Sequence, residues 1–139
     1  LTPIGQAEIK RPGRDVTVVT WSKMVGVALR AADQLAADGI EVEVVDLRTL
    51  SPLDIDTVLE SVTKTGRLVC VDEASPRCNI ATDISAQVAM HAFRALKAQI
   101  EMVCPPHVPV PFSPSLEDLY IPGAPAIAEA VRRTVKGKN

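Results

Sequence analysis

Cysteine is scarce in this sequence. Its three cysteines, Cys70, Cys78 and Cys104, are an odd number without CxxC spacing, which argues against a disulfide framework and against a zinc site. We expect reduced, mostly buried thiols and, with them, a cytoplasmic setting. No apolar run reaches the roughly 18 residues that a membrane-spanning helix needs, and no signal-peptide pattern precedes the first predicted strand.

The chain also lacks an excess of positive charge. It carries 15 Lys and Arg against 17 Asp and Glu, so its formal net charge is −2. A basic footprint for nucleic acid or for an anionic membrane is therefore missing, and neither is an expected partner. Hydrophobic residues make up 47% of the sequence, which is typical of a folded protein, and 139 residues suit a single domain.

Motifs for nucleotide binding and for nucleophilic catalysis are missing too. The stretch "TWSKMVG" follows the first predicted strand, where a dinucleotide-binding fold would carry GxGxxG, and neither GxxxxGK[ST] nor GxSxG occurs. The two histidines, His91 and His107, are far apart in the sequence and have no carboxylate at ligand spacing. Taken by themselves, the residues predict a scaffold without an active site.

What the sequence does contain is a regular alternation of β-branched runs and helical spacing. This pattern predicts strands over 16–21, 41–47, 67–73 and 100–104, and helices over 22–39, 55–66, 79–97 and 125–135. Strand–helix alternation with short connections predicts an α/β fold, a three-layer sandwich with a mostly parallel sheet and helices on both faces. Residues 1–139 are interpreted as one domain.

Proline is concentrated in one place. Five of the eleven prolines lie in "PPHVPVPFSP", residues 105–114. Proline has no amide proton and its ring fixes φ near about −65°, so this run can be neither a helix nor a central strand. We predict a rigid, extended arm over 105–123, a linker over 1–14 and a tail over 136–139.

Polar residues at the predicted strand ends are the first candidates for a site, because open α/β sheets bind ligands beyond the carboxyl ends of their strands. Ser22 and Arg48 are possible contacts for a small anion, although a helix cap for Ser22 and an ion pair or turn hydrogen bond for Arg48 are simpler roles. Asp72 and Glu73 are adjacent on a strand, so their side chains point to opposite faces and do not suit a paired acid and base.

Four stretches carry a family resemblance: "DVTVVTWSKMV" (15–25), "GIEVEVVDLRTLSPLD" (39–54), "KTGRLVCVDEA" (64–74) and "HVPVPFSPSLEDLYIP" (107–122). In this order they resemble the C-terminal domain of the transketolase superfamily, and more narrowly the β subunit of the E1 component of 2-oxoacid dehydrogenase complexes. The stretch "DEASPRCNIATDISA" (72–86) lacks the glycine-rich turn of pyruvate-type subunits and is most similar to the acetoin dehydrogenase β subunit. Pyruvate and branched-chain 2-oxoacids stay open as substrates.

The resemblance implies a parent enzyme that binds thiamin diphosphate and magnesium, cleaves a carbon–carbon bond beside a carbonyl, and passes the acyl group to a lipoyl arm on E2. In that family the α subunit holds the pyrophosphate and the metal, while the activating glutamate lies in the N-terminal domain of the β subunit. The resemblance therefore implies no catalytic, cofactor-binding or metal-binding residue in this chain, and an isolated chain without activity. The implied partners are the E1 α subunit, a second β subunit and the E2 acyltransferase.

The resemblance also implies a role for the proline-rich arm as an assembly element that pairs β subunits and helps E2 to dock. The interface candidates are His107, Val108, Val110, Phe112, Glu117, Asp118, Leu119 and Tyr120. Three alternatives stay open: an arm that wraps the sheet edge of its own domain, a free-standing anion-binding or regulatory module, and an autonomous enzyme that uses His107 with Asp72 or Glu73.

Overall fold

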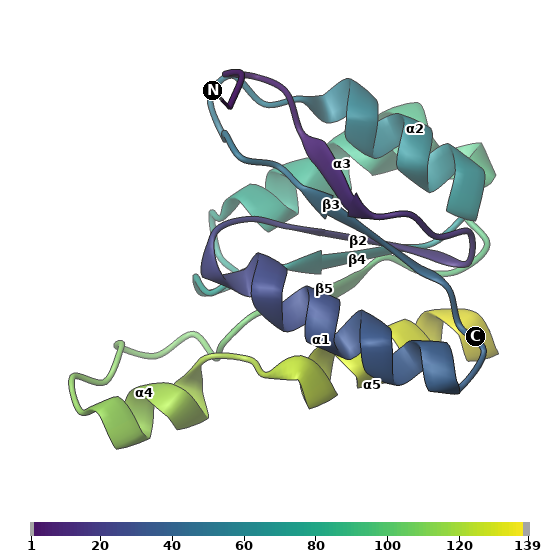
Figure 1. Ribbon diagram of the computed structural model, residues 1–139. Helices are drawn as coiled ribbons and strands as arrows, with labels where there is room; N and C mark the ends of the chain where they lie inside the picture. Colours follow the sequence, from purple (N-terminus) through teal and green to yellow (C-terminus); the bar gives the residue numbers. More distant parts are fainter. Residues whose placement is uncertain (1, 138–139) are drawn as a thin grey trace.

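A five-stranded sheet lies between two layers of helices in the computed structural model, which describes residues 2–137 (Figure 1). Neighbouring strands follow the order β1-β3-β2-β4-β5; β2 to β5 run parallel, and β1 pairs with β3 in the antiparallel direction. The strands are β1 (Glu8–Arg11), β2 (Val16–Thr20), β3 (Val42–Asp46), β4 (Leu68–Val71) and β5 (Glu101–Val103). After β2 the chain adds β3 on one side of β2, and then crosses over to add β4 on the other side of β2.

Two helices cover each face of the sheet, as the sequence predicts. Helices α1 (Lys23–Ala37) and α5 (Ala124–Lys136) pack on one face, and α2 (Ile55–Thr65) and α3 (Ile80–His91) pack on the other. A short 3₁₀ helix, η1 (Phe93–Ala95), follows α3, and helix α4 (Pro114–Tyr120) lies apart from both layers (Figure 1). The predicted α/β class, with a mostly parallel sheet, is confirmed.

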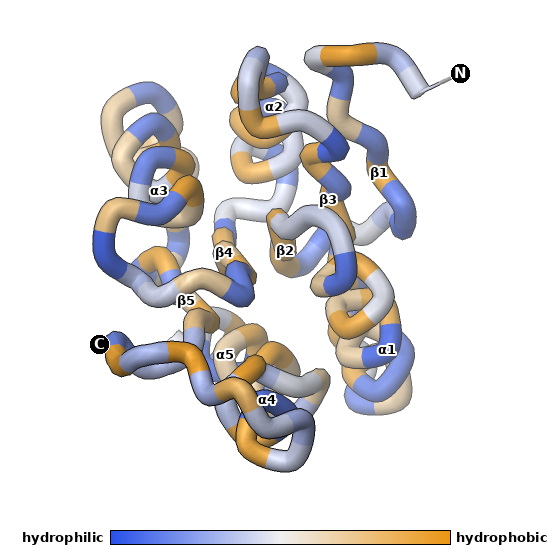
Figure 2. Tube along the Cα trace, turned by 90° about the vertical axis from the view of Figure 1, so that its left-hand side faces the viewer, coloured by the Kyte–Doolittle hydropathy of each residue, from blue (hydrophilic) through white to orange (hydrophobic). Residues whose placement is uncertain are grey.

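The apolar strands supply a core to each face because successive side chains point in opposite directions. Val18 and Val44 face α1 and α5, whereas Val19 and Val45 face α2 and α3. Figure 2 shows these hydrophobic strands between the two pairs of helices. Near-continuous runs of valine in β2 and β3 are therefore explained by burial on both faces.

Three predicted boundaries are wrong. The predicted linker over 1–14 contains an edge strand at Glu8–Arg11. This strand is held by hydrogen bonds to β3 and not by burial, since Ile9 is exposed. The helix predicted over 79–97 ends at His91, and η1 follows it. In the predicted tail, Lys136 belongs to α5 and Gly137 is its C-cap, while 138 and 139 lie outside the described residues.

The predicted extended arm is also wrong in part, since Pro114–Tyr120 form α4. Pro114 stands in the first turn of this helix, where its missing N–H has no intrahelical acceptor to lose and its fixed φ already suits a helix. Glu117 lies in the same turn, where a negative charge is favoured by the helix dipole. The last proline of the run therefore starts a helix, which a count of prolines does not reveal.

A buried carboxylate joins the sheet to α2. Glu43 on β3 is fully buried, and its Oε1 accepts a hydrogen bond from Ser61 Oγ at 2.6 Å. Its Oε2 pairs with the ammonium of Lys64 and accepts a bond from the N–H of Gly13 at 3.2 Å. Burial raises the pKa of Glu43, but the hydrogen bonds from Lys64, Ser61 and Gly13 outweigh it and hold that pKa below its usual value.

The same network extends to β2 through hydroxyl groups. Thr17 Oγ1 lies 2.7 Å from Ser61 Oγ and 2.8 Å from Thr65 Oγ1, so one buried threonine bridges two turns of α2. Thr65 Oγ1 in turn donates to the carbonyl of Arg67 at 3.1 Å. These polar groups are satisfied inside the core, which fixes the position of α2 along the strands.

Replacing Glu43 with glutamine tests this network. We expect a loss of about 2 kcal/mol in the free energy of unfolding at neutral pH, because the charge-assisted bonds to Lys64 and Ser61 are weakened. A folded-state pKa below the unfolded value stabilises the protein above the unfolded pKa, and this contribution is lost as the pH falls through the folded pKa. Urea unfolding across this acidic range should show the gap between wild type and E43Q closing. A gap that stays constant, or an equal loss in the exposed control Glu60→Gln, would contradict the assignment.

Gly66 offers a second test, because it ends α2 in the left-handed region with φ 75° and its N–H donates to the carbonyl of Val62 at 2.7 Å. A Cβ there would lie 2.7 Å from the Lys97 side chain, whereas Gly39 has nearly the same φ and open space around it. We expect Gly39→Ala to cost about 1 kcal/mol of stability and Gly66→Ala about 1 kcal/mol more. Thermal unfolding measures both, and Lys97→Ala should remove the difference; a difference that survives would show that crowding by Lys97 is not its cause.

Candidate functional site

The segment of residues 105–123, called the arm from here on, leaves the body of the domain after β5. Pro105 is still buried, but residues 106–110 and 112–119 are exposed, and α4 has no buried residue. Figure 1 shows α4 projecting beyond the two helical layers. The alternative in which the arm wraps the sheet edge of its own domain does not describe this geometry.

Apolar side chains on the arm face solvent. Phe112 is fully exposed and Leu119 is 84% exposed, and the complete set, called the apolar row from here on, is Val108, Val110, Phe112, Leu116 and Leu119. A monomeric protein rarely exposes so many large apolar groups in one segment, and such surfaces mark interaction sites. Leu116 is not among the predicted interface residues; on α4 it lies three and four residues before Leu119 and Tyr120, and so on one face with them.

The arm has few contacts with the body. His107 Nδ1 lies 3.2 Å from Ser75 Oγ, in the loop after β4, and the hydroxyl of Tyr120 donates to the carbonyl of Val108 at 3.4 Å within the arm itself. Between the arm and the loop lies a shallow hollow of about 510 Å³, lined by Glu73, Ala74, Ser75, His107, Val108, Pro109, Val110 and Tyr120. His107 and Glu73 therefore share a hollow, although no hydrogen bond joins them among the described residues.

The other two predicted interface residues, Glu117 and Asp118, are exposed on α4. They carry negative charge on the same short helix as Leu116 and Leu119. The arm thus presents apolar groups next to carboxylates, a combination that suits an apolar surface with basic residues at its margin.

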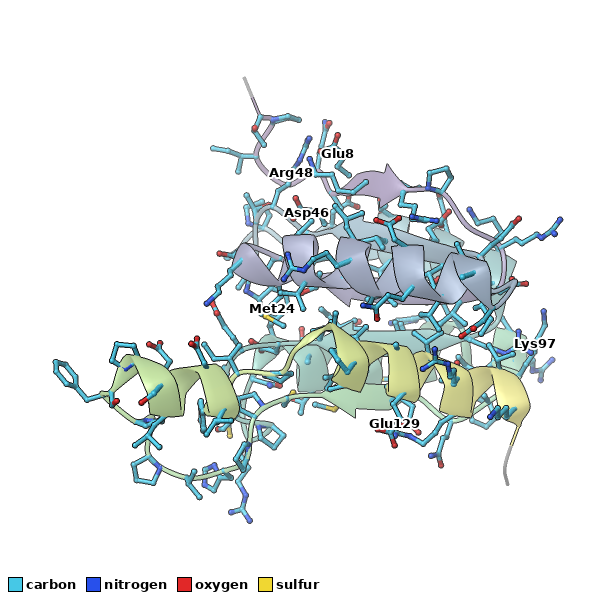
Figure 3. All side chains as sticks on the ribbon, turned by 60° about the horizontal axis from the view of Figure 1, so that its bottom comes forward. Glu8, Met24, Asp46, Arg48, Lys97 and Glu129 are labelled. Carbon is cyan, nitrogen blue, oxygen red and sulfur yellow. The ribbon has the colours of Figure 1, made fainter. Side chains whose placement is uncertain are left out.

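Ser22 and Arg48, the two possible anion contacts, make different interactions in the structure. Ser22 takes the predicted N-cap position of α1, but its side chain makes no capping hydrogen bond, and only its carbonyl accepts one, from the N–H of Val25 at 3.2 Å. Arg48 pairs with Glu8, and its N–H donates to Asp46 Oδ1 at 3.0 Å, as expected for a strand-end ion pair and turn bond. Figure 3 shows Glu8, Asp46 and Arg48 together at one end of the sheet. With Lys10 as the larger cause, Arg48 also lowers the pKa of Glu8.

The carboxyl ends of β2 and β4 meet at a second hollow, of about 380 Å³. Its lining consists of Trp21, Leu50, Asp72, Glu73, Ala74, Ser75, Arg77, Cys78, Asn79 and Ile80. Asp72 is 3% exposed; its Oδ1 accepts from the N–H of Ala74 at 2.9 Å, whereas its Oδ2 has no hydrogen-bond partner among the described residues. Burial, and then the charge of Glu73, raise the pKa of Asp72.

The three cysteines are free thiols that differ in burial. Cys70 is buried, and burial raises the pKa of its thiol to about 12, while burial likewise raises the pKa of the half-buried Cys104. Cys78 is exposed, contrary to the expectation of mostly buried thiols.

Within residues 2–137 no three side chains of His, Cys, Asp or Glu are grouped to hold a metal ion. No helix in that range is both long enough and apolar enough to cross a membrane.

Comparison with known proteins places the chain in a family. Residues 5–127 match the family described as "Transketolase, C-terminal domain". The chain is 73% identical over 135 residues to "Acetoin:2,6-dichlorophenolindophenol oxidoreductase subunit beta" of Cupriavidus necator, a match that covers 97% of this chain and 40% of that protein. It is 46% identical over 131 residues to "Pyruvate dehydrogenase E1 component subunit beta-1, mitochondrial" of Arabidopsis thaliana, covering 94% and 36% respectively.

A solved structure supports the same conclusion. The protein described as "Split gene transketolase, inactive beta4 tetramer" superposes with a TM-score of 0.84 at 27% identity, covering 99% of this chain and 44% of that one. The chain therefore spans less than half of the length of these relatives. The resemblance predicted from the four quoted stretches is confirmed. Since the family match covers most of its length and a solved relative shares its fold, this chain belongs to the transketolase C-terminal domain family.

Proposed function

We propose that this chain is the C-terminal assembly domain of the β subunit of a thiamin-diphosphate-dependent E1 dehydrogenase, and that it contributes subunit contacts and no catalytic residue. The exposed apolar row on the arm is the observation that carries this proposal. Similarity to two dehydrogenase β subunits, of which the chain corresponds to 40% and 36%, supports it. In the parent enzyme the partners would be the E1 α subunit, a second β subunit and the E2 acyltransferase.

The physical argument begins with the cost of leaving the apolar row in water. Burying a Val, Leu or Phe side chain that is otherwise exposed contributes about 1.5–3 kcal/mol, and the row contains five such residues. Docking costs little conformational entropy because Pro106, Pro109 and Pro111 already restrict the backbone of the arm. A stiff, apolar segment held away from the body is therefore suited to contact another subunit.

We propose a second β subunit as the occupant of this surface. The solved relative with a TM-score of 0.84 is described as a β4 tetramer, so association between copies of such a subunit has a precedent in the same fold. The carboxylates of Glu117 and Asp118 lie on the same helix as Leu116 and Leu119, and they would face basic residues at the margin of the contact. The alternative of a free-standing anion-binding module is less well supported, because the charge of Arg48 is already paired with Glu8.

The parent enzyme would bind thiamin diphosphate and magnesium, and the cofactor would supply the carbanion chemistry. The described residues do not fit either group, since no cluster of three possible metal ligands occurs among them and no glycine-rich phosphate loop follows β2. The higher identity to the acetoin-type subunit favours acetoin over pyruvate as the substrate of the parent enzyme. A cytoplasmic setting is part of the same proposal.

The double substitution Phe112→Ser with Leu119→Ser tests the arm. We expect self-association of the chain to weaken at least tenfold, because two of the most exposed members of the apolar row lose their burial on contact. Sedimentation velocity over a range of concentrations measures this effect, and circular dichroism checks that the fold is kept. Phe93→Ser is the matched control, since Phe93 is 70% exposed on η1, away from the arm.

Two results would contradict the proposal. One is an unchanged association constant in the arm variant, and the other is an equal loss in Phe93→Ser, which would show that exposed aromatic groups drive non-specific association.

A further inference from the structure

The hollow at the ends of β2 and β4 lies where the winding of the sheet changes direction. The chain leaves β2 to build β3 on one side, and then builds β4 on the other side of β2. Connections leave the two strands in opposite directions at such a point, which opens a crevice at their carboxyl ends, and this is where open α/β sheets bind ligands. Trp21 directly follows β2 and Asp72 directly follows β4, and both belong to the lining of the hollow.

Asp72 contains an unsatisfied group. Asp72 is almost completely buried, and its Oδ2 finds no hydrogen-bond donor among residues 2–137. Buried polar atoms in folded proteins nearly always have a partner, and a buried carboxylate oxygen without one is costly. The other oxygen, Oδ1, accepts a hydrogen bond from the N–H of Ala74, so only one of the two carboxyl oxygens is satisfied. Because Asp72 belongs to the lining of the hollow, a donor bound there is the candidate partner of its carboxyl group.

The surroundings indicate which donor would bind. Glu73 adds a second negative charge to the lining and Arg77 adds one positive charge, so the net formal charge of the lining is −1. Trp21 supplies an indole ring, whose face attracts cations. We propose that this hollow binds a guanidinium or ammonium group, with the carboxyl group of Asp72 as the acceptor of its hydrogen bond. The cation comes either from a free small molecule or from a basic side chain of another protein chain.

Trp21 is the one tryptophan of the sequence, so its fluorescence reports directly on the site. Titration of the 139-residue chain with agmatine at constant ionic strength should give a saturable change with a dissociation constant of about 1 mM or tighter. Butylurea, an uncharged donor, should give no saturable change. Isothermal titration calorimetry under the same conditions provides a second readout that does not depend on the indole.

Two variants move the affinity in opposite directions. Asp72→Asn keeps the acceptor for Ala74 N–H and should weaken agmatine binding at least about tenfold, while thermal unfolding of the free chain stays unchanged or improves because an unpaired carboxyl is removed. Arg77→Gln removes the competing cation from the lining and should strengthen binding. Glu60→Gln, an exposed acid on α2 outside the hollow, should leave the affinity as it is. A purely structural role for Asp72 predicts none of these changes in affinity.

Sedimentation velocity in the presence of agmatine separates the two sources of the cation. If agmatine weakens self-association, and if Asp72→Asn weakens it as well, the donor is a basic side chain of a second copy. Saturable binding without any change in association identifies a free small cation. Either result upholds the site. The proposal is overturned if neither fluorescence nor calorimetry shows saturable binding, or if Asp72→Asn binds agmatine as wild type does. The site involves the body of the domain and not the apolar row, so its failure would leave the assembly role of the arm intact.

Discussion

The carboxylate of Glu43 inside the core is the interaction on which the arrangement of the domain depends. A buried negative charge is tolerated only with excellent compensation, and here three donors supply it: Ser61 and Lys64 on α2, and the N–H of Gly13 before β2. These donors hold α2 on β3 and bring the segment before β2 against the start of β3, so close that a Cβ on Gly13 would lie 2.3 Å from the backbone nitrogen of Glu43. The helix that leads into β4 is thereby positioned by polar contacts as well as by packing.

The placement of α2 has consequences at the opposite end of the sheet. Helix α2 connects β3 to β4 across β2, and this crossover produces the order β1-β3-β2-β4-β5. The carboxyl ends of β2 and β4 become neighbours only in this order, which brings Trp21 and Asp72 into one hollow. The arm, in contrast, follows the last strand of the sheet, where no further strand covers it. The two surfaces with a proposed role thus arise from the same winding of the chain.

The sequence predicts the sheet and the helices on its two faces well, because they arise from local patterns that recur along the chain. Runs of valine at 16–19 and 42–45 require burial on both faces, and helical spacing between the runs supplies the cover. Strand β1 was not predicted because its order comes from pairing with β3, a contact more than 30 residues away that its sequence "EIKR" does not reveal. Helix α4 is not predicted because the effect of proline depends on its position. Proline breaks a helix in its interior but is favoured in the first turn, where Pro114 lies. The row of exposed groups could be predicted in most of its members, whereas the unpaired oxygen of Asp72 depends on three-dimensional neighbours and could not.

The few contacts between the arm and the body have a consequence for how such domains diverge. Among the described residues, one side-chain hydrogen bond, between His107 and Ser75, joins the arm to the body, and the hydroxyl of Tyr120 donates within the arm. Substitutions at positions such as Phe112 or Leu119 therefore remove no packing from either hydrophobic core. Selection can alter what this surface binds while the free energy of folding stays nearly constant. Under the proposed assembly role, partner choice and stability are encoded in separate parts of the chain, so that a duplicated gene can acquire a new partner without first acquiring a more stable fold.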